Sequence, residues 1–175
     1  MNCVTLFALM SWCVLCGQAM HLMRPRPRPR PLDSAETWNQ LNMMTKIAQS
    51  NDRDHETRLI PVIPSERFKE EETCCVNVVI LNYYLNNILQ QHPSDKRYPS
   101  INVVRSDLHR IARDLEPHCS KTDFSEHEHV KKFTGNYMKA SDLYGDETKA
   151  RNKAVGETDI LFHYLYESCT PRKRH

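Results

Sequence analysis

The stretch Thr73–Gln91, TCCVNVVILNYYLNNILQQ, decides the fold of this chain. It contains no Gly, no Pro and no charged residue, and it begins with two adjacent cysteines. A helix that is apolar on most sides is a buried one, and a run of this length without a turn residue favours a helix over the alternative, a buried strand. We therefore predict a central helix covered by its neighbours. Its apolar residues form two adjacent helical stripes: Val78, Leu81, Leu85 and Ile88, and Val76, Ile80 and Tyr83.

The N-terminus has the pattern of a secretory signal. An apolar run from Val4 to Leu15 is followed by Gly17-Gln18-Ala19, which predicts a signal peptide at residues 1–19 with cleavage after Ala19. The run is too short for a typical membrane span, and a signal anchor is the alternative. We therefore expect a secreted, extracellular protein.

Four of the seven cysteines lie beyond this signal, at Cys74, Cys75, Cys119 and Cys169. An even number in an oxidising compartment predicts two disulfides. A bridge between the neighbours Cys74 and Cys75 would be strained. The two remaining pairings both link the start of the central helix to Cys119 and Cys169.

Basic residues concentrate at the two ends of the mature chain. Residues 20–32 form an Arg- and Pro-rich leader, expected to be extended, and residues 171–175 form a basic tail. Removing the seven Lys and Arg of these two tracts from the total of 24 leaves 17 against 22 acidic residues. The predicted domain at residues 33–170 is therefore net acidic.

Further apolar stripes at helical spacing surround the central helix. Only four glycines occur in the chain, and no strand pattern or tandem repeat is present. We predict an all-α bundle of about six helices, joined by a long irregular loop after the first. The expected helices run from Asp33 or Ser34 to Gln49, from Ser65 to Glu72, along the central stretch, from Ser100 to Glu116, from Asp123 or Ser125 to Tyr144, and from Asp146 to Cys169.

Motifs for catalysis are missing from the sequence. It has no Gly-rich phosphate loop, G-x-S-x-G, H-E-x-x-H or mature C-x-x-C, so we expect neither an enzyme nor a cofactor. The group His118, Cys119, His127 and His129 matches no standard zinc spacing. No N-x-S/T sequon is present. Function is better sought in two polar segments, the loop Asp52–Pro61 and the stretch Arg151–Asp159, where Gly156 interrupts a helix.

Several short motifs resemble the interleukin-10 family of class II helical cytokines. The resemblance spans Met43 to Cys169, and several groups within the family, including the interleukin-26 and interleukin-20 types, share its general pattern. The motifs are Thr57-Arg58-Leu59-Ile60, Ile80-Leu81-Asn82 and Asn87-Ile88-Leu89 after Cys74, Cys119, Lys153-Ala154-Val155-Gly156-Glu157-Thr158-Asp159-Ile160-Leu161-Phe162, and Cys169.

The resemblance implies a secreted cytokine that binds a class II receptor chain and recruits a shared second chain. Signalling would then pass through Janus kinases and STAT factors in immune and epithelial defence, and a soluble binding protein is a further expected partner. We expect a monomer, no nucleic-acid partner and no membrane insertion. By matching position, the implied receptor-binding residues are Asp52, Glu56, Arg58, Ile60, Lys153, Gly156, Glu157, His163 and Tyr166. Leu59-Ile60 would supply an apolar anchor beside Arg58.

The resemblance also implies a disulfide between Cys74 and Cys169. In relatives, the cysteine at the position matching Cys119 is bonded to an N-terminal cysteine. That N-terminal cysteine is absent here, so Cys75 remains as the partner of Cys119. A helical lipid carrier is the alternative from another functional class, and it would need an apolar cavity inside the bundle.

Overall fold

The computed structural model describes residues 29–54, 56–64, 69–90 and 93–170. The predicted signal peptide, most of the leader, the tail and the start of the helix expected from Ser65 lie outside these residues. Within them every regular element is helical, which confirms the all-α prediction. The α-helices are α2 (Arg30–Asp33), α3 (Ala35–Ser50), α4 (Glu70–Tyr83), α5 (Ile101–Cys119), α6 (Glu128–Tyr144), α7 (Glu147–Gly156) and α8 (Thr158–Cys169), with a π-helical turn η2 (Tyr84–Ile88) and a 3-10 turn η3 (Pro93–Arg97).

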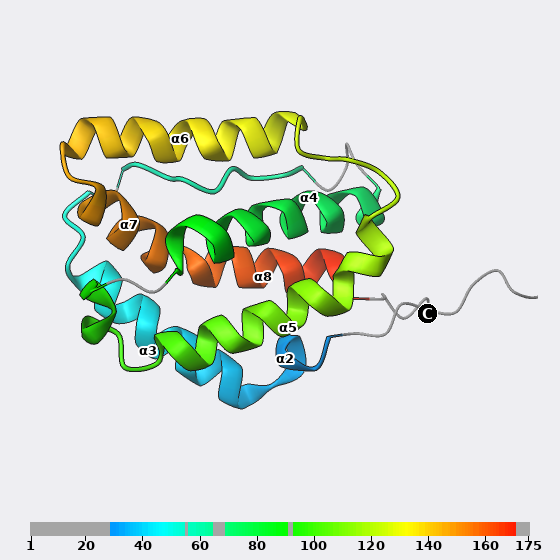
Figure 1. The fold of residues 1–175 in the computed structure, drawn as a ribbon, viewed down its shortest axis with the longest axis horizontal. Helices are drawn as coiled ribbons and strands as arrows, with labels where there is room; N and C mark the ends of the chain where they lie inside the picture. The colour runs from blue at the N-terminus through cyan, green and yellow to red at the C-terminus, as the bar shows by residue number, and fades with distance from the viewer. Residues whose placement is uncertain (1–28, 55, 65–68, 91–92, 171–175) are drawn as a thin grey trace, which may run out of the picture.

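Helix α4 lies at the centre of the bundle, as predicted. Figure 1 shows it between α6 and α5, with α8 packed along it. Ile80, Leu81 and Tyr84 have no exposed surface, because α5, α6 and α8 together cover most of the circumference of α4. Burial of each such side chain contributes roughly 1.5–3 kcal/mol.

Two disulfides hold the first turn of α4. Cys74 is bonded to Cys169, at the end of α8, and Cys75 to Cys119, at the end of α5. The first pair is the one that the family resemblance implied, and the second is the one that remained by elimination. Since both bonds join the start of α4 to the end of another helix, α5 and α8 run antiparallel to α4.

The ends of the central helix differ from the prediction. Helix α4 begins at Glu70 rather than Thr73, because Glu70, Glu71 and Glu72 complement the positive end of the helix dipole. Its far end changes to the π-helical turn η2, where the Leu89 amide bonds the Tyr84 carbonyl at 2.7 Å. The helix can stop before Gln91 because arginine side chains from other helices satisfy its last carbonyls.

Buried Arg151 of α7 supplies two of these contacts. Its Nε donates to the Ile88 carbonyl at 2.6 Å and its Nη2 to the Gln90 carbonyl at 3.2 Å. Arg105 of α5 donates to the Leu89 carbonyl at 2.8 Å. Asp95 of η3 pairs with Arg151 at 2.7 Å and balances its charge.

Two predicted boundaries, the end of α5 and the start of α6, were wrong. Helix α5 continues through Pro117 and includes Cys119, because a proline in the last turn removes one donor while the Ser120 amide still reaches the Glu116 carbonyl at 2.9 Å. Helix α6 is not capped by Asp123 or Ser125, because the Asp123 carboxylate accepts from the Ser125 amide in a local turn. His127 caps it instead, its Nδ1 accepting from the His129 amide at 3.3 Å.

The last predicted helix is divided at Glu157 into α7 and α8. Its start agrees with the prediction, since Asp146 caps α7, and Gly145 ends α6 with a φ of 56°. A Cβ at Gly156 would lie 3.3 Å from Gln49 Cγ and 3.6 Å from Ala48 Cβ. The glycine therefore lies where α3 and α7 approach closely, and a side chain there would have to displace Gln49 by a few tenths of an ångström.

The described residues begin inside the predicted leader, part of which is helical. Pro31 and Leu32 are buried in the short helix α2, and the Trp38 indole donates to the Leu32 carbonyl at 3.1 Å. The helix expected to start the domain is α3, which Ser34 caps.

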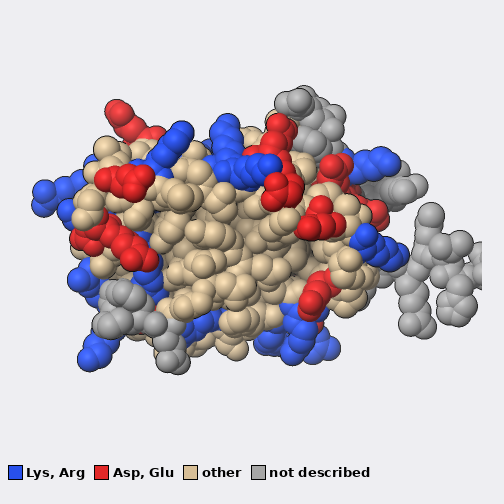
Figure 2. All heavy atoms as spheres, turned by 45° about the horizontal axis from the view of Figure 1, so that its top comes forward, with Lys and Arg blue, Asp and Glu red and all other residues tan. Residues whose placement is uncertain are grey.

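Charged residues are unevenly distributed over the surface. On the face shown in Figure 2, Lys, Arg, Asp and Glu gather toward the edges and leave the middle largely uncharged. In the interior, charged residues gather in one place instead. The buried Lys, Arg, Asp and Glu side chains of the described residues are Arg151, Lys153 and Glu157, all in α7 or directly after it.

Candidate functional site

The loop that follows α3 meets α7 at a polar depression of about 350 Å³. The loop comprises residues 51–64, of which 55 lies outside the description. Five of the predicted receptor-binding residues come together here: Asp52, Arg58, Lys153, Gly156 and Glu157. Gln49, Thr57, Asp159 and Ile160 complete the lining.

Glu157 holds the loop by its backbone. Its carboxylate accepts from the amides of Leu59 and Ile60, each at 3.0 Å, and its side chain is buried. Burial raises the pKa of Glu157, while the Ile60 and Leu59 amides and the charges of Lys153 and Arg58 oppose that rise. Glu157 therefore acts as an internal anchor for the loop.

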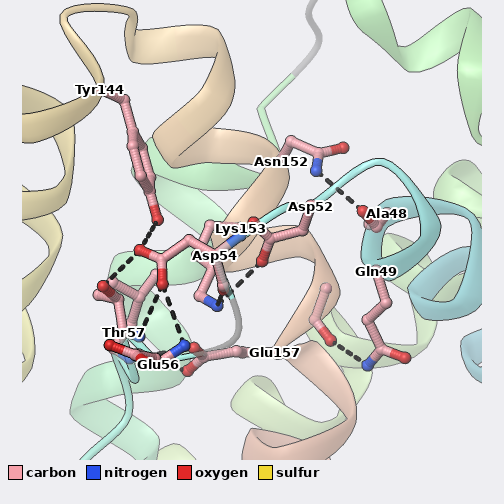
Figure 3. A network of polar contacts seen from close by, with 12 residues as sticks. Ala48, Gln49, Asp52, Asp54, Glu56, Thr57, Tyr144, Asn152, Lys153 and Glu157 are labelled. Atoms are coloured by element: carbon pink, nitrogen blue, oxygen red, sulfur yellow. Dashed lines mark hydrogen bonds and ion pairs between the residues drawn. The ribbon is translucent and has the colours of Figure 1, made fainter.

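Lys153 holds the loop one turn earlier on α7. Its ammonium group donates to the Asp54 carbonyl at 2.5 Å and pairs with the Asp52 carboxylate at 2.9 Å (Figure 3). The lysine is 7% exposed, so the ion pair is largely shielded from water. Lys153 and Glu157 lie four residues apart on one face of α7, which is the face that the loop covers.

Asp54 organises the turn that leads to Arg58, and the sequence did not single it out. Its carboxylate accepts from the amides of Glu56 and Thr57, both at 3.0 Å, from the Thr57 hydroxyl at 2.5 Å and from the Tyr144 hydroxyl at 2.7 Å (Figure 3). The Thr57 bonds are the largest cause of the strongly lowered pKa of Asp54. An Asp followed three residues later by Thr is a turn pattern that could have indicated this role.

Arg58 is one of two cations that the described part of the loop exposes, the other being Arg53, and it is the one that lines the depression. Its Nε donates to the Ile60 carbonyl at 2.9 Å, and its Nη2 donates to the Tyr164 hydroxyl of α8 at 2.7 Å. These bonds use only part of the five-donor guanidinium group, so the side chain can still bind a partner's carboxylate. The orientation of the group is set by the loop and by α8 together.

The expected apolar anchor is not exposed. Leu59 and Ile60 have no accessible side-chain surface and belong to the chain's own core. Their amides bond Glu157, and this draws both side chains inward. Gly156 is also buried, and its carbonyl accepts from the Gln49 side chain at 2.8 Å.

The other predicted residues lie outside the depression. Glu56 is exposed beside the Asp54 turn, and His163 of α8 is exposed and faces Glu167 at 3.2 Å. Tyr166 is half-buried, and its ring contacts Trp38 of α3 edge-on, with the ring centroids 6.0 Å apart. Most of the predicted receptor-binding residues therefore lie together where the loop meets α7. His163 and Tyr166 lie farther along, on α8.

The described residues hold no group of three or more His, Cys, Asp or Glu placed to bind a metal. Cys119, which the sequence placed near three histidines, is occupied by its disulfide. In the same residues no helix is both long and apolar enough to cross a bilayer. The depression itself is lined mainly by polar and charged side chains, unlike the apolar cavity of a lipid carrier.

Comparison with known proteins identifies relatives of this chain. The family model described as "Interleukin 22 IL-10-related T-cell-derived-inducible factor" matches residues 33–169. The crystal structure of zebrafish IL-22 is 47% identical in sequence and superposes with a TM-score of 0.70, covering 82% of this chain and 98% of that one. No curated protein sequence matches the chain. The extent of the family match and the identity to a solved member together show that the chain belongs to the interleukin-22 family of interleukin-10-related cytokines.

Proposed function

We propose that this cytokine is secreted and signals by bringing two class II receptor chains together. A long-chain receptor resembling the interleukin-22 receptor alpha chain binds first, and a shared chain resembling the interleukin-10 receptor beta chain follows. Janus kinases and STAT factors carry the signal in immune and epithelial defence. A soluble binding protein competes for the same surface, and the cytokine acts as a monomer.

The observation that carries this proposal is the tethered loop. Ordering an irregular segment on binding costs conformational entropy. Here Lys153 bonds a carbonyl of the loop and Glu157 bonds two of its amides, so the loop is already held in one shape. Arg58 is presented on this ordered segment, and arginine is enriched among residues that dominate binding energy. We assign the primary receptor contact to Arg58, Asp52 and Glu56 of the loop, extended by His163 and Tyr166 of α8.

The buried members of the predicted set have a supporting role in this proposal. Lys153, Gly156, Glu157 and Ile60 shape the loop from within and reach the receptor mainly through the surface that they hold in place. Their substitution would therefore change affinity and stability together. Substitution of the exposed members, Glu56, Arg58 and His163, would change affinity alone.

Binding of the folded protein to receptor ectodomains tests the proposal. Chains of the interleukin-22 receptor alpha, interleukin-20 receptor and interleukin-10 receptor beta types are titrated side by side, followed by STAT phosphorylation in cells that carry the two binding chains. The expected result is saturable binding to the interleukin-22 type and a signal only when the shared chain is present. Tighter binding to the interleukin-20 type would reassign the receptor, and binding to none would reject the function.

A further inference from the structure

Helix α6 contacts the loop through two polar side chains that lie outside the predicted site. The Asn136 amide group donates to the carbonyls of Arg58 at 3.2 Å and Leu59 at 3.0 Å. The Tyr144 hydroxyl donates to the Asp54 carboxylate at 2.7 Å (Figure 3). Eight residues of helix separate the two side chains by roughly 12 Å, so α6 holds the loop at two separate points.

The segment around Arg58 is therefore bonded on both of its edges. Its carbonyls at positions 58 and 59 accept from Asn136 of α6, while its amides at 59 and 60 donate to Glu157 at the end of α7. Backbone groups that a sheet would satisfy with neighbouring strands are satisfied here by two side chains. Loss of either partner leaves one edge of the segment unpaired.

We propose that Asn136 and Tyr144 are positioning residues for receptor binding, and that α6 fixes the loop in the shape that presents Arg58. This inference rests on the proposed function of the loop. Asn136 acts through the main chain of Arg58, and Tyr144 acts through the turn at Asp54. Because the loop is ordered before the partner arrives, less conformational entropy is lost on binding.

The surroundings of Asp54 give a readout specific to this role. Tyr144 is the donor from α6, Lys153 of α7 bonds the Asp54 carbonyl, and the remaining neighbours, Asp52, Glu56 and Thr57, belong to the loop. Removal of the Tyr144 hydroxyl takes away one bond that lowers the pKa of Asp54. The carboxylate of Tyr144→Phe should therefore titrate closer to the ordinary value of 3.8.

The experiment compares Tyr144→Phe and Asn136→Ala with two matched controls. Tyr98→Phe removes a hydroxyl that bonds Asn152 of α7 at 2.5 Å without touching the loop, and Asn86→Ala changes an exposed residue of η2. NMR follows the Asp54 titration and the exchange of the Leu59 and Ile60 amides in the free protein. Surface-immobilised receptor ectodomain gives the affinity and dissociation rate.

We expect a raised Asp54 pKa in Tyr144→Phe and faster exchange of both amides in Asn136→Ala. Each variant should bind the receptor about 3- to 10-fold more weakly, as expected for the loss of one or two hydrogen bonds, while both controls stay within about twofold. In an Asp54→Ala background, Tyr144→Phe should add little, because the acceptor of the Tyr144 hydroxyl is already absent.

Two results would overturn the inference. Unchanged titration and exchange would show that α6 does not hold the loop, and changed NMR signals with unchanged affinity would show that the tether does not serve binding. Wild-type protein that binds no receptor ectodomain contradicts the proposed function. The NMR measurements need no receptor, so they still decide whether α6 holds the loop.

Discussion

At the scale of single residues, Glu157 links two parts of the chain that are distant in sequence. The sequence placed it on the helix face that binds a receptor, whereas the structure places its carboxylate against the amides of Leu59 and Ile60. A buried carboxylate that accepts from two buried amides keeps the loop ordered and has little surface left to contact a receptor.

Substitution of Glu157 by alanine should destabilise the fold. It leaves the amides of Leu59 and Ile60 without their acceptor, and each buried unsatisfied donor costs about 1–3 kcal/mol. We expect a loss of about 2–4 kcal/mol in the free energy of urea unfolding. Glu157→Gln keeps one acceptor oxygen and should lose less, so equal losses in the two variants would argue against the anchor.

Asp54 should make stability depend on pH in a predictable direction. Its folded pKa lies well below the ordinary 3.8, so its contribution is present above that value and is lost as the pH falls through the folded pKa. The stability advantage of wild type over Asp54→Asn should be full at pH 6 and shrink below pH 3.8. Chemical denaturation of both proteins across this range measures it, and an advantage that does not change with pH would contradict the assignment.

The site residues were only partly predictable. Position matching found Arg58 and Lys153 because they lie in motifs, but it could not separate exposed contacts from buried anchors. That distinction depends on the path of a loop with no periodic pattern. Asn136 and Tyr144 were missed because each is an ordinary helix residue until the loop is placed beside it.

At the scale of elements, helix stripes were predicted well and helix ends were not. The core positions Val104, Leu108 and Ile111 of α5 are buried as their spacing indicated. The end of α4 could not be predicted, because Arg151 and Arg105 satisfy its carbonyls from positions 61 and 16 residues away. Periodicity is a local signal, whereas many helix ends are fixed by tertiary contacts.

Helix α6 has a glycine that its packing does not require. A Cβ at Gly135 would meet nothing within 4 Å, so Gly135→Ala should stabilise the protein by roughly 0.5–1 kcal/mol through helix propensity. Gly145→Ala is the matched control, since its φ of 56° disfavours a side chain and should make that variant less stable. Thermal unfolding of the two variants should shift in opposite directions, and a destabilised Gly135→Ala would contradict this account of α6.

At the scale of the whole molecule, the two disulfides and the tethered start of the loop lie at opposite ends. Both disulfides join the start of α4 to the ends of α5 and α8, whereas α7 and the start of the loop lie at the other end of the bundle (Figure 1). The sequence could indicate the number of disulfides from the cysteine count, but the family resemblance was needed to choose the pairing.

The two disulfides should differ in their contributions to stability. The Cys74–Cys169 bond spans 95 residues and the Cys75–Cys119 bond 44, so the longer loop should contribute about 0.7 kcal/mol more through chain entropy. Paired Cys→Ala variants, compared by urea unfolding, measure the difference. Each should also keep wild-type receptor affinity while folded, and a large loss of affinity would show that the two ends are coupled.

The affinity of Arg58→Ala for the receptor ectodomain is the most direct measurement, with Arg113→Ala on exposed α5 surface as the charge-matched control. If the tethered loop is the receptor-binding surface, Arg58→Ala should bind at least tenfold more weakly, which corresponds to about 1.4 kcal/mol. Its melting temperature should stay within about 2 °C of wild type, because its bonds are at the surface. Wild-type affinity in Arg58→Ala, or an equal loss in Arg113→Ala, would contradict the assignment of binding to this loop.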